Sequence, residues 1–376
     1  MIFDRYLLKS LALATLFTAL TLAMIILLTQ SLRFLELIIN SGASGAAFFA
    51  LTALALPRFF EVILPLALMI SIVFVYNRMA MDSEIVVMRA AGRSPMALGM
   101  PALTLATVVT VVLIWITAWL APVSLAGMQQ MRQVIKAQYS TLFFREGVFN
   151  NVGDDLTVYV RARNAEGELE GIVIYDSRDT GAQPVTIIAK RGVIVISDTG
   201  QQVLVYDGSR QVLNPQNGVL DRLNFERYSI DLPESGAVRQ RWREPEERTL
   251  GELLSPDPSV ERDMENSHEF MIEAHRRIVS PFLALTFAAI SLVCLLIGPI
   301  DRRGQNRRIT IAVLSVVILQ GLYLGTYNLA VESWWGLGLM YALVFIPMIG
   351  GLLLLSRHGE IIRRRLLYKP PQRARA

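Results

Sequence analysis

The sequence contains little cysteine and histidine for its length. Among 376 residues there is one cysteine, Cys294, which cannot form an intramolecular disulfide. It lies in an apolar run, where a cysteine usually acts as a small buried hydrophobic residue. The three histidines, His268, His275 and His358, form no Cys/His cluster, so the sequence offers no zinc-site pattern. Charged residues are also few, at 18% against about 25% in soluble proteins, while hydrophobic residues reach 53%. Much of the chain therefore has no water-facing surface to cover.

Signatures of catalysis and of nucleotide binding are missing as well. The sequence has no glycine-rich loop ending in Lys-Ser or Lys-Thr, which would cradle nucleotide phosphates. It also lacks the Gly-x-Ser-x-Gly pattern of a nucleophilic serine and the His-Glu-x-x-His pattern of a zinc peptidase. We therefore expect a protein that is not an enzyme, has no catalytic residue or metal site, and binds no cofactor itself.

Long apolar runs are what the sequence has instead. Six stretches are long enough to cross a hydrocarbon core, which needs roughly 20 helical residues. They run approximately over Leu11–Leu37, Pro57–Tyr76, Met96–Leu120, Ile278–Ile297, Ile309–Leu329 and Trp335–Leu355. A polar region of about 150 residues, the size of one domain, separates the third run from the fourth. The predicted fold class is an α-helical transmembrane bundle of six spans, arranged three plus three around an inserted domain.

Lysine and arginine are distributed unevenly around these runs. Basic residues cluster in segments that would all lie on one side if every run crosses the membrane: Arg5 and Lys9; Arg78, Arg89 and Arg93; Arg302, Arg303, Arg307 and Arg308; Arg357, Arg363, Arg364 and Arg365. The loop 40–56 and the turn around Glu332 carry no basic residue. By the positive-inside rule the clustered side is cytoplasmic. Both termini are then cytoplasmic, and the large domain lies on the other side.

The region between the third and fourth runs has the pattern of antiparallel β-structure. Short segments rich in β-branched and aromatic residues alternate with turn-forming residues such as those at 164–167 and 179–181. These segments are Leu156–Val160, Gly171–Tyr175, Val185–Ala189 and Val203–Tyr206. Their spacing predicts an antiparallel sandwich or an open roll. Residues 234–269 are charged, and we expect a connector there with one short helix at Thr249–Leu254.

This interpretation divides the chain into four parts. Residues 1–122 hold the first three spans, with a cytoplasmic helix at 82–92 between the second and the third. Residues 123–272 form the β-rich domain with its connectors, and residues 273–356 hold spans four to six. Residues 357–376 form a basic cytoplasmic tail.

The segment between the second and third runs is the most informative loop. It can form a short helix, with Asp82 or Ser83 as N-cap and Gly92 just after the C-terminal cap. An amphipathic helix in this position can dock into a groove of a partner protein, and Glu84 would offer an acceptor to a basic partner residue. The alternative is a helix that lies on the membrane surface. The predicted contact residues are Asp82, Ser83, Glu84, Ile85, Met88 and Arg89.

Charged residues near the outer ends of the first two runs form a second informative set. Arg33 and Glu36 lie three residues apart in the first run, and Arg58 and Glu61 repeat this spacing in the second. Three-residue spacing places each pair on one helical face, so pairing within the helix is one interpretation. A rim that meets an anionic lipid head group is the other. We take these four residues as candidates for a substrate cavity.

Four segments of the sequence match one known pattern. They are Ile2–Leu7, Glu61–Leu66, Ser83–Gly92, and Glu273–Arg277 with Pro281. Together they resemble the LptF/LptG family, the permease subunits of the bacterial lipopolysaccharide exporter, and the likeness covers essentially the whole chain. The segment around Glu84 is the most specific of the four. Gly167–Asp176 and Ile187–Ala189 are more similar to the LptF branch than to the LptG branch.

The resemblance implies a function in transport. Such a chain would pair with a homologous LptG-like permease and sit on a dimer of a separate LptB-like ATPase, which uses ATP and magnesium. It would pass lipopolysaccharide to LptC-like and LptA-like periplasmic bridge proteins from the bacterial inner membrane. The helix around Glu84 would be the coupling helix that enters the ATPase. The β-domain would be an open jelly roll for acyl chains, and Arg33 a contact for substrate phosphates. No nucleic acid is expected as a partner.

Two other functions fit the same residues. A membrane-anchored periplasmic scaffold would need no energy coupling, so Glu84 would be dispensable. A permease of a different lipid or lipoprotein exporter would have a β-domain whose inner face is polar or closed. The alternating apolar residues of the predicted strands supply an apolar face, but they do not show whether this face is open to a ligand.

Overall fold

A computed structural model describes most of the chain as two compact units. The described residues are 2–41, 44–140, 146–151, 155–164, 168–178, 183–197, 200–213, 220–231, 242–297, 305–357 and 359. One unit, the helical unit, comprises residues 1–33, 52–128 and 243–376. The other, the β-unit, comprises residues 34–51 and 129–242.

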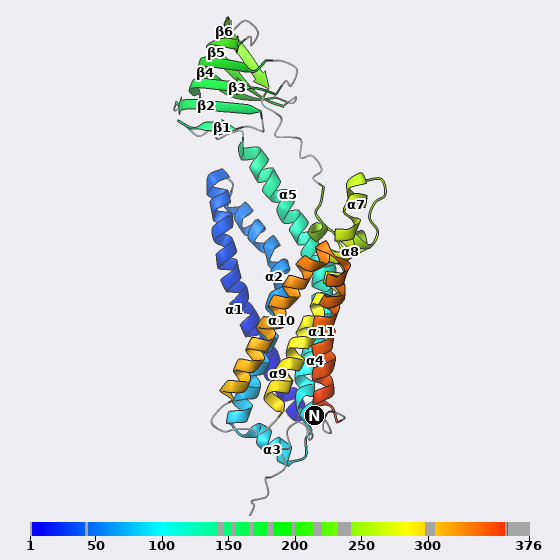
Figure 1. The fold of residues 1–376 in the computed structure, drawn as a ribbon. Coiled ribbons are helices and arrows are strands. Elements are labelled where there is room, and N and C mark those ends of the chain that lie inside the picture. The colour runs from blue at the N-terminus through cyan, green and yellow to red at the C-terminus, as the bar shows by residue number, and fades with distance from the viewer. Residues whose placement is uncertain are drawn as a thin grey trace, which may run out of the picture. The chain divides into compact units, whose positions relative to one another are not determined.

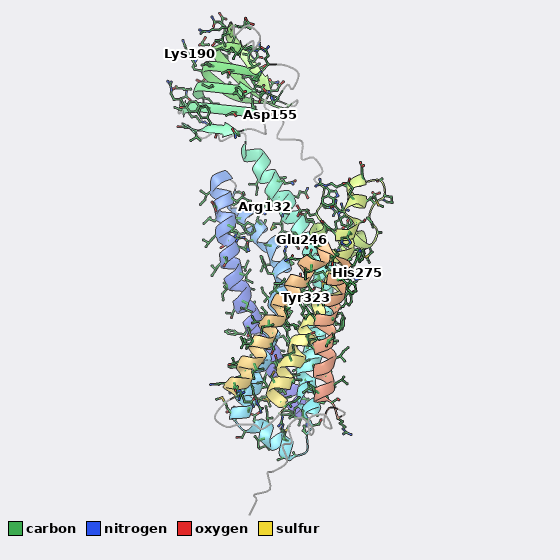
Figure 2. The ribbon with its side chains drawn as sticks, viewed as in Figure 1. Arg132, Asp155, Lys190, Glu246, His275 and Tyr323 are labelled. Carbon is green, nitrogen blue, oxygen red and sulfur yellow. The ribbon has the colours of Figure 1, made fainter. Side chains whose placement is uncertain are left out.

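All six predicted spans are helices, shown as ribbons in Figure 1 and with side chains in Figure 2. They are α1 (Ile2–Ser41), α2 (Gly45–Met81), α4 (Pro95–Trp115), α9 (Leu283–Leu296), α10 (Asn306–Glu332) and α11 (Trp334–Leu355). Two of them are extended by neighbouring helices, because α5 (Ala121–Ser140) continues α4 and α8 (Ser267–Val279) precedes α9. The six-span, three-plus-three arrangement is thus confirmed.

The third span contains a π-helical turn, Ile116–Leu120, between α4 and α5. Pro122 follows it in the first turn of α5. In a regular α-helix the ring of Pro122 would clash with the carbonyl group of Ala118, four residues earlier. The wider π turn includes that carbonyl group and relieves the clash, so the helix continues to Ser140 without a break.

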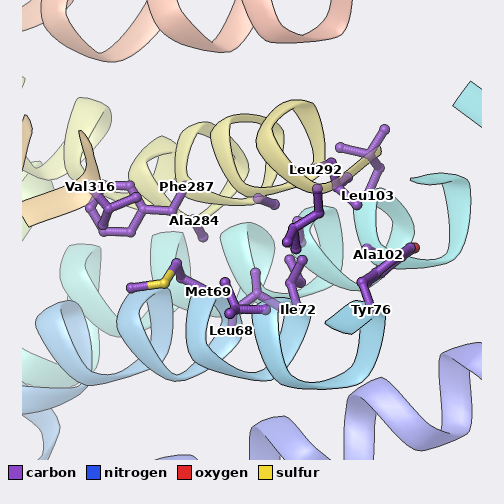
Figure 3. Packing of buried hydrophobic residues seen from close by; sticks show 14 of the residues in the cluster. Leu68, Met69, Ile72, Tyr76, Ala102, Leu103, Ala284, Phe287, Leu292 and Val316 are labelled. Carbon is purple, nitrogen blue, oxygen red and sulfur yellow. The ribbon is translucent and has the colours of Figure 1, made fainter. Parts of the chain in front are cut away.

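The core of the helical unit lies where α2, α4 and α9 meet. Ile72 and Tyr76 of α2 pack near Ala102 of α4 and Leu292 of α9, as Figure 3 shows, and all four side chains are almost fully buried. Small residues such as Ala102 let helices approach closely, which is how helices pack in lipid, where apolar burial supplies no driving force between them. The buried Tyr76 hydroxyl donates a hydrogen bond of 2.7 Å to the carbonyl oxygen of Leu98, so this hydroxyl is paired.

The β-unit contains one antiparallel sheet of six strands in sequence order. The strands are β1 (Phe149–Asn151), β2 (Leu156–Arg163), β3 (Leu169–Asp176), β4 (Val185–Ser197), β5 (Gly200–Leu213) and β6 (Leu220–Asp231). The four predicted segments lie in β2 to β5, so the inserted antiparallel domain is confirmed. The predicted turns at 164–167 and 179–181 fall largely outside the described residues.

One line of positions interrupts the strand pairing across this sheet. Arg161, Gly171, Lys190 and Asp207 lie at this level of β2, β3, β4 and β5, between residues that pair on either side. Gly171 and Asp207 have positive φ angles of 63° and 52°, values that interrupt an extended strand. We call these four residues the fold line.

The fold line lets a single sheet enclose its own core. In β3 the buried positions are Ile172 and Ile174 on one side of the line and Leu169 on the other, so the inward-facing parity changes there. Leu169 nevertheless shares one hydrophobic cluster with the other two and with Val205 of β5. The two halves of the sheet therefore cover the same core. Of the two predicted forms, the described strands fit an open roll made of one folded sheet, and not a sandwich of two sheets.

Gly208, next to the fold line, has no room for a side chain. A Cβ atom there would lie 2.4 Å from the carbonyl oxygen of Ile188 and 2.5 Å from the ring of Phe225. We expect Gly208→Ala to destabilise the β-unit by about 1–3 kcal/mol, the usual cost of overpacking, and to increase its proteolysis in the full-length, membrane-embedded protein. Gly251→Ala in α6 (Leu250–Leu254), where a Cβ meets nothing within 4 Å, is the control. Equal protease resistance of the two variants would contradict this expectation.

The connector before α9 contains more helix than predicted. The predicted short helix is α6, where Thr249 and Glu252 form a capping box. α7 (Glu261–Glu265) and α8 follow it, so the expectation of a single helix was wrong. The reason is that α7 buries a charged residue, Asp263, which pairs with Arg248 at 2.7 Å and which a charge pattern alone assigns to solvent. Only residues 357 and 359 of the predicted basic tail belong to the described part of the chain. Arg302 and Arg303 of the predicted basic loop before α10 also lie outside it.

Candidate functional site

The segment between α2 and α4 forms a short helix, α3, at the end of the helical unit where the N-terminus lies (Figure 1). α3 spans Glu84–Ala90, two residues shorter at each end than predicted. Its C-terminal end is closed by Gly92, whose φ is 86°. The N–H of Gly92 donates to the carbonyl of Arg89, and the N–H of Arg93 donates to the carbonyl of Met88. These two bonds form a Schellman motif, so the prediction that Gly92 ends the helix is confirmed.

Ser83 begins α3 in an unusual conformation. It is the N-cap residue, one of the two predicted alternatives, but its side chain makes no capping hydrogen bond. Its φ of 62° lies in the left-handed region, which costs a residue with a side chain roughly 1–2 kcal/mol. The bend at Ser83 separates α2 from α3 and directs α3 across the end of the bundle (Figure 1).

α3 has an inner face and an outer face. Ile85 is fully buried, Met88 packs against the core of the helical unit, and Arg89 donates a hydrogen bond to a backbone carbonyl at the end of α9. These three predicted contact residues therefore attach α3 to the bundle, and Ile85 is not available to a partner. Val86 and Val87 are the exposed apolar residues of α3, with Val87 64% exposed. Neither Val86 nor Val87 was predicted as a contact residue, because the sequence alone does not show which face of α3 is buried.

Two carboxylates stand at the start of α3. Glu84 is half-buried, and no other described residue forms an ion pair with it. Asp82 is exposed and lies 3.7 Å from the Nε atom of Arg78 on α2. Such an exposed pair contributes at most about 1 kcal/mol, so it does not prevent Asp82 from binding elsewhere. Glu84 and Asp82 thus remain accessible beside the outer face of α3.

A buried ionic cluster lies at the opposite end of the helical unit. Glu273 of α8 is 1% exposed and accepts hydrogen bonds from the Nε atoms of Arg276 at 2.7 Å and Arg277 at 2.8 Å. Arg276 also pairs with Glu61 of α2 at 2.6 Å. The Tyr327 hydroxyl of α10 donates to Glu273 at 3.3 Å. Two carboxylates thus balance two guanidinium groups, which is the condition under which charges can be buried.

The same cluster attaches the connector to the bundle. Arg277 donates to the backbone carbonyls of Pro245 at 3.0 Å and Glu246 at 2.9 Å. Arg58 of α2 pairs with the side chain of Glu246, labelled in Figure 2, at 2.6 Å. Arg58 and Glu61 therefore have partners on distant segments. Pairing within the helix, one interpretation of their three-residue spacing, is wrong for these two residues.

The four residues predicted for a substrate cavity have different surroundings. Arg58 and Glu61 line a cavity of only about 20 Å³, which holds a water molecule and no lipid head group. Arg33 and Glu36 are exposed on α1, and neither forms an ion pair with another described residue. A contact of Arg33 or Glu36 with substrate stays a prediction.

The β-unit has a much larger cavity, of about 970 Å³. Its size falls in the range of ligand-binding cavities, about 300–1,000 Å³. At its edge Arg178 pairs with Asp176 at 2.6 Å, and this guanidinium holds the pKa of the Asp176 carboxyl below its ordinary value. The lining combines apolar residues with charged ones: Val185, Ile187, Val212, Tyr228 and Ile230 with Asp176, Arg178, Arg210, Asp221 and Asp231.

Comparison with known protein families shows to which family the chain belongs. Residues 5–358 match the model of one family, described as the lipopolysaccharide export system permease LptF/LptG. The chain belongs to the LptF/LptG family. The resemblance seen in the sequence is confirmed, and the six apolar helices fit a multi-pass membrane protein of this permease family.

Individual LptF/LptG relatives match at modest identity. An uncharacterized protein of Rickettsia prowazekii is 23% identical over 337 residues, which cover 89% of this chain and 92% of that protein. LptG of Escherichia coli, a lipopolysaccharide export system permease protein, is 28% identical over 185 residues, 46% of this chain and 48% of LptG. LptF of the same organism is 24% identical over 212 residues, 56% of this chain and 58% of LptF. The chain thus aligns with about half of each Escherichia coli protein, and its assignment to the LptF branch stays a prediction.

Proposed function

We propose that the chain is a permease subunit of an ATP-driven exporter that removes lipopolysaccharide from the inner membrane and passes it to a periplasmic bridge. Its partners in this proposal are a homologous LptG-like permease, an LptB-like ATPase dimer, and LptC-like and LptA-like bridge proteins. Both termini and α3 face the cytoplasm and the β-unit lies in the periplasm, in accordance with the positive-inside rule. ATP and magnesium bind to the partner ATPase, and this chain has no catalytic role.

The cavity of the β-unit is the observation that supports this proposal most. A lipid with several acyl chains cannot cross water uncovered, because exposing its apolar surface costs about 25 cal/mol per Å². The cavity of about 970 Å³ has apolar residues such as Ile187 and Val212 in its lining, while Arg210 offers a cation to acidic groups. A permease of a different lipid or lipoprotein exporter was expected to have a closed or polar inner face; this cavity is open, and its lining includes both apolar and charged residues.

The edges of the sheet fit transfer to a further protein. β6 is an edge strand among the described strands, and nearly all of its side chains are exposed. An exposed edge strand of this length can pair with a strand of another chain. Strand addition at β6 would extend the roll into the next bridge protein and give acyl chains a continuous covered route.

Energy reaches the permease through α3 in this proposal. Val86 and Val87 present exposed apolar side chains to the groove of the partner, and Glu84 lies beside them as the hydrogen-bond acceptor. Arg89 and Ile85 attach the inner face to the bundle, so a displacement of α3 is transmitted to α9 and not absorbed by a loose loop.

Glu84→Ala in the complete exporter tests this proposal. Truncating one partner of an interfacial charge pair costs about 2–5 kcal/mol, so we expect lipopolysaccharide release from proteoliposomes to fall at least about tenfold. ATP hydrolysis should also lose its dependence on lipopolysaccharide. Glu265→Ala, which removes an exposed carboxylate from α7, is the control and should leave both rates unchanged.

Two results would reject parts of the proposal. Normal lipopolysaccharide release by Glu84→Ala would show that α3 does not couple the ATPase to transport. Purification of the unaltered chain without an ATPase and without lipopolysaccharide would replace the exporter by the membrane-anchored scaffold.

A further inference from the structure

A groove between α1 and α2 has a lining that suits one lipid molecule. Its volume is about 700 Å³, and it is lined by the N-terminal half of α1, the C-terminal part of α2 and the first residue of α3. Leu13 and Phe17 of α1 and Phe74 of α2 line it with side chains that are 67%, 73% and 61% exposed. Its deeper wall includes Leu7 and Met79, which are buried. The greater part of the groove is therefore apolar and open on one side of the helical unit.

The charged residues of the groove all lie at the end next to α3. They are Arg78 and Asp82, at the C-terminal end of α2, and Glu84, at the start of α3. Arg78 and Asp82 are 74% and 55% exposed, and 3.7 Å separates their nearest charged atoms, so the pair is weak. One cation and two anions thus stand together where the apolar part of the groove ends.

We propose that this groove binds one glycerophospholipid with a zwitterionic head group, taken from the leaflet on the α3 side. An acyl chain lies along Phe17 and Phe74, the phosphate meets Arg78, and the ammonium group meets Asp82. The charges favour this head group because its ammonium group forms an ion pair with the carboxylate of Asp82. A glycerol head group offers only neutral hydroxyls there, and a serine head group adds a carboxylate that Asp82 repels. The apolar surface of the acyl chain is covered on one side by the groove and on the other side by the bilayer.

The lipid in this groove differs from the exported substrate. The inference rests on the proposed function for the orientation of α3 toward the cytoplasm, which assigns the groove to the inner leaflet. Lipopolysaccharide enters from the outer leaflet in the proposed export reaction, so the two lipids use different sites. Because Glu84 lines the groove, a bound phospholipid contacts the first turn of α3 and fixes its start.

A pair of matched substitutions on α1 tests the proposal. Ala14 lines the groove, and Ala14→Phe would fill it, whereas Ala12 is exposed on the same helix outside the groove. The complete exporter is reconstituted in nanodiscs of phosphatidylethanolamine and phosphatidylglycerol in equal amounts, transferred to detergent, and its retained lipids are identified by mass spectrometry. We expect the unaltered chain and Ala12→Phe to retain phosphatidylethanolamine, and Ala14→Phe to lose it. Arg78→Glu should abolish the preference for phosphatidylethanolamine over phosphatidylglycerol.

Several outcomes would overturn the inference. These are equal retention by Ala14→Phe and Ala12→Phe, a preference for phosphatidylglycerol in the unaltered chain, or a photo-crosslinker at position 74 that captures a polypeptide in place of lipid. Lipopolysaccharide release is measured on the same preparations. Release without retained phospholipid would reject the groove alone, whereas retained phospholipid without release would reject only the proposed export function.

Discussion

Replacing Glu273 by alanine is expected to destabilise the helical unit by about 3–5 kcal/mol, which is the usual cost of removing one partner from a buried ion pair. The substitution takes the shared acceptor from Arg276 and Arg277, and Arg277 is itself 4% exposed. Water cannot replace the lost carboxylate at these buried positions without opening the contact between α8 and the connector. Thermal unfolding of the purified protein in nanodiscs, followed by tryptophan fluorescence, measures the loss.

Glu269→Ala is the matched control for this prediction. Glu269 lies one turn earlier on α8 and is exposed, so its removal should change the free energy of unfolding by no more than about 0.5 kcal/mol. A further variant, Glu273→Gln, keeps the shape and one acceptor and should lie between the two. If Glu273→Ala unfolds at the same temperature as Glu269→Ala, the cluster does not stabilise the helical unit.

Replacing Val185 by tryptophan is expected to reduce lipopolysaccharide transport by roughly tenfold or more, equivalent to ~1.4 kcal/mol for each tenfold. Val185 lies on β4 between Asp176 and Val212, and it lines the cavity of the β-unit. An indole ring there would occupy volume that the proposed function assigns to acyl chains. Transport is measured as lipopolysaccharide reaching the cell surface in cells that depend on the variant, and as release from proteoliposomes.

A second tryptophan on the same strand separates blocking from misfolding. Ile188 is 42% exposed and does not line the cavity, so Ile188→Trp places the same indole ring on the other face of β4. It should leave transport close to that of the unaltered chain. Equal loss of transport in both variants would mean that bulk on β4 disturbs the sheet, and the cavity would then have no demonstrated part in export.

The elements that the sequence predicted correctly are those with a strong local signal. The six spans follow from the thickness of the bilayer, which requires about 20 apolar residues and leaves few alternatives. β2 to β5 were predicted because segments rich in β-branched residues are separated by short runs of turn-forming residues. Gly92 was found as the end of α3 because glycine adopts a positive φ without strain. Each of these signals depends only on neighbours in the chain.

The features that were missed depend on distant residues. β6 was not predicted, because its apolar residues alternate only over two short stretches, Leu223–Phe225 and Tyr228–Ile230, which charged residues separate. The partners of Arg58 and Glu61 lie on the connector and on α8, and helical spacing cannot point to them. The inner face of α3 is defined by α9, so the contact residues could not be divided between bundle and partner before the fold was known.

The ionic cluster also sets a condition on how the protein is made. Glu61 and Arg276 are 215 residues apart, so at about 5–20 residues per second the ribosome delivers Arg276 roughly 10–40 s after Glu61. During that interval the carboxylate of Glu61 has no partner from the second half of the chain, and a lone charge in a span costs up to about 3 kcal/mol. The first three helices therefore stay in the membrane without their ion-pair partner until the last three helices have been synthesised and inserted. Charge neutrality at Glu61 makes the two halves of this permease depend on each other during biogenesis.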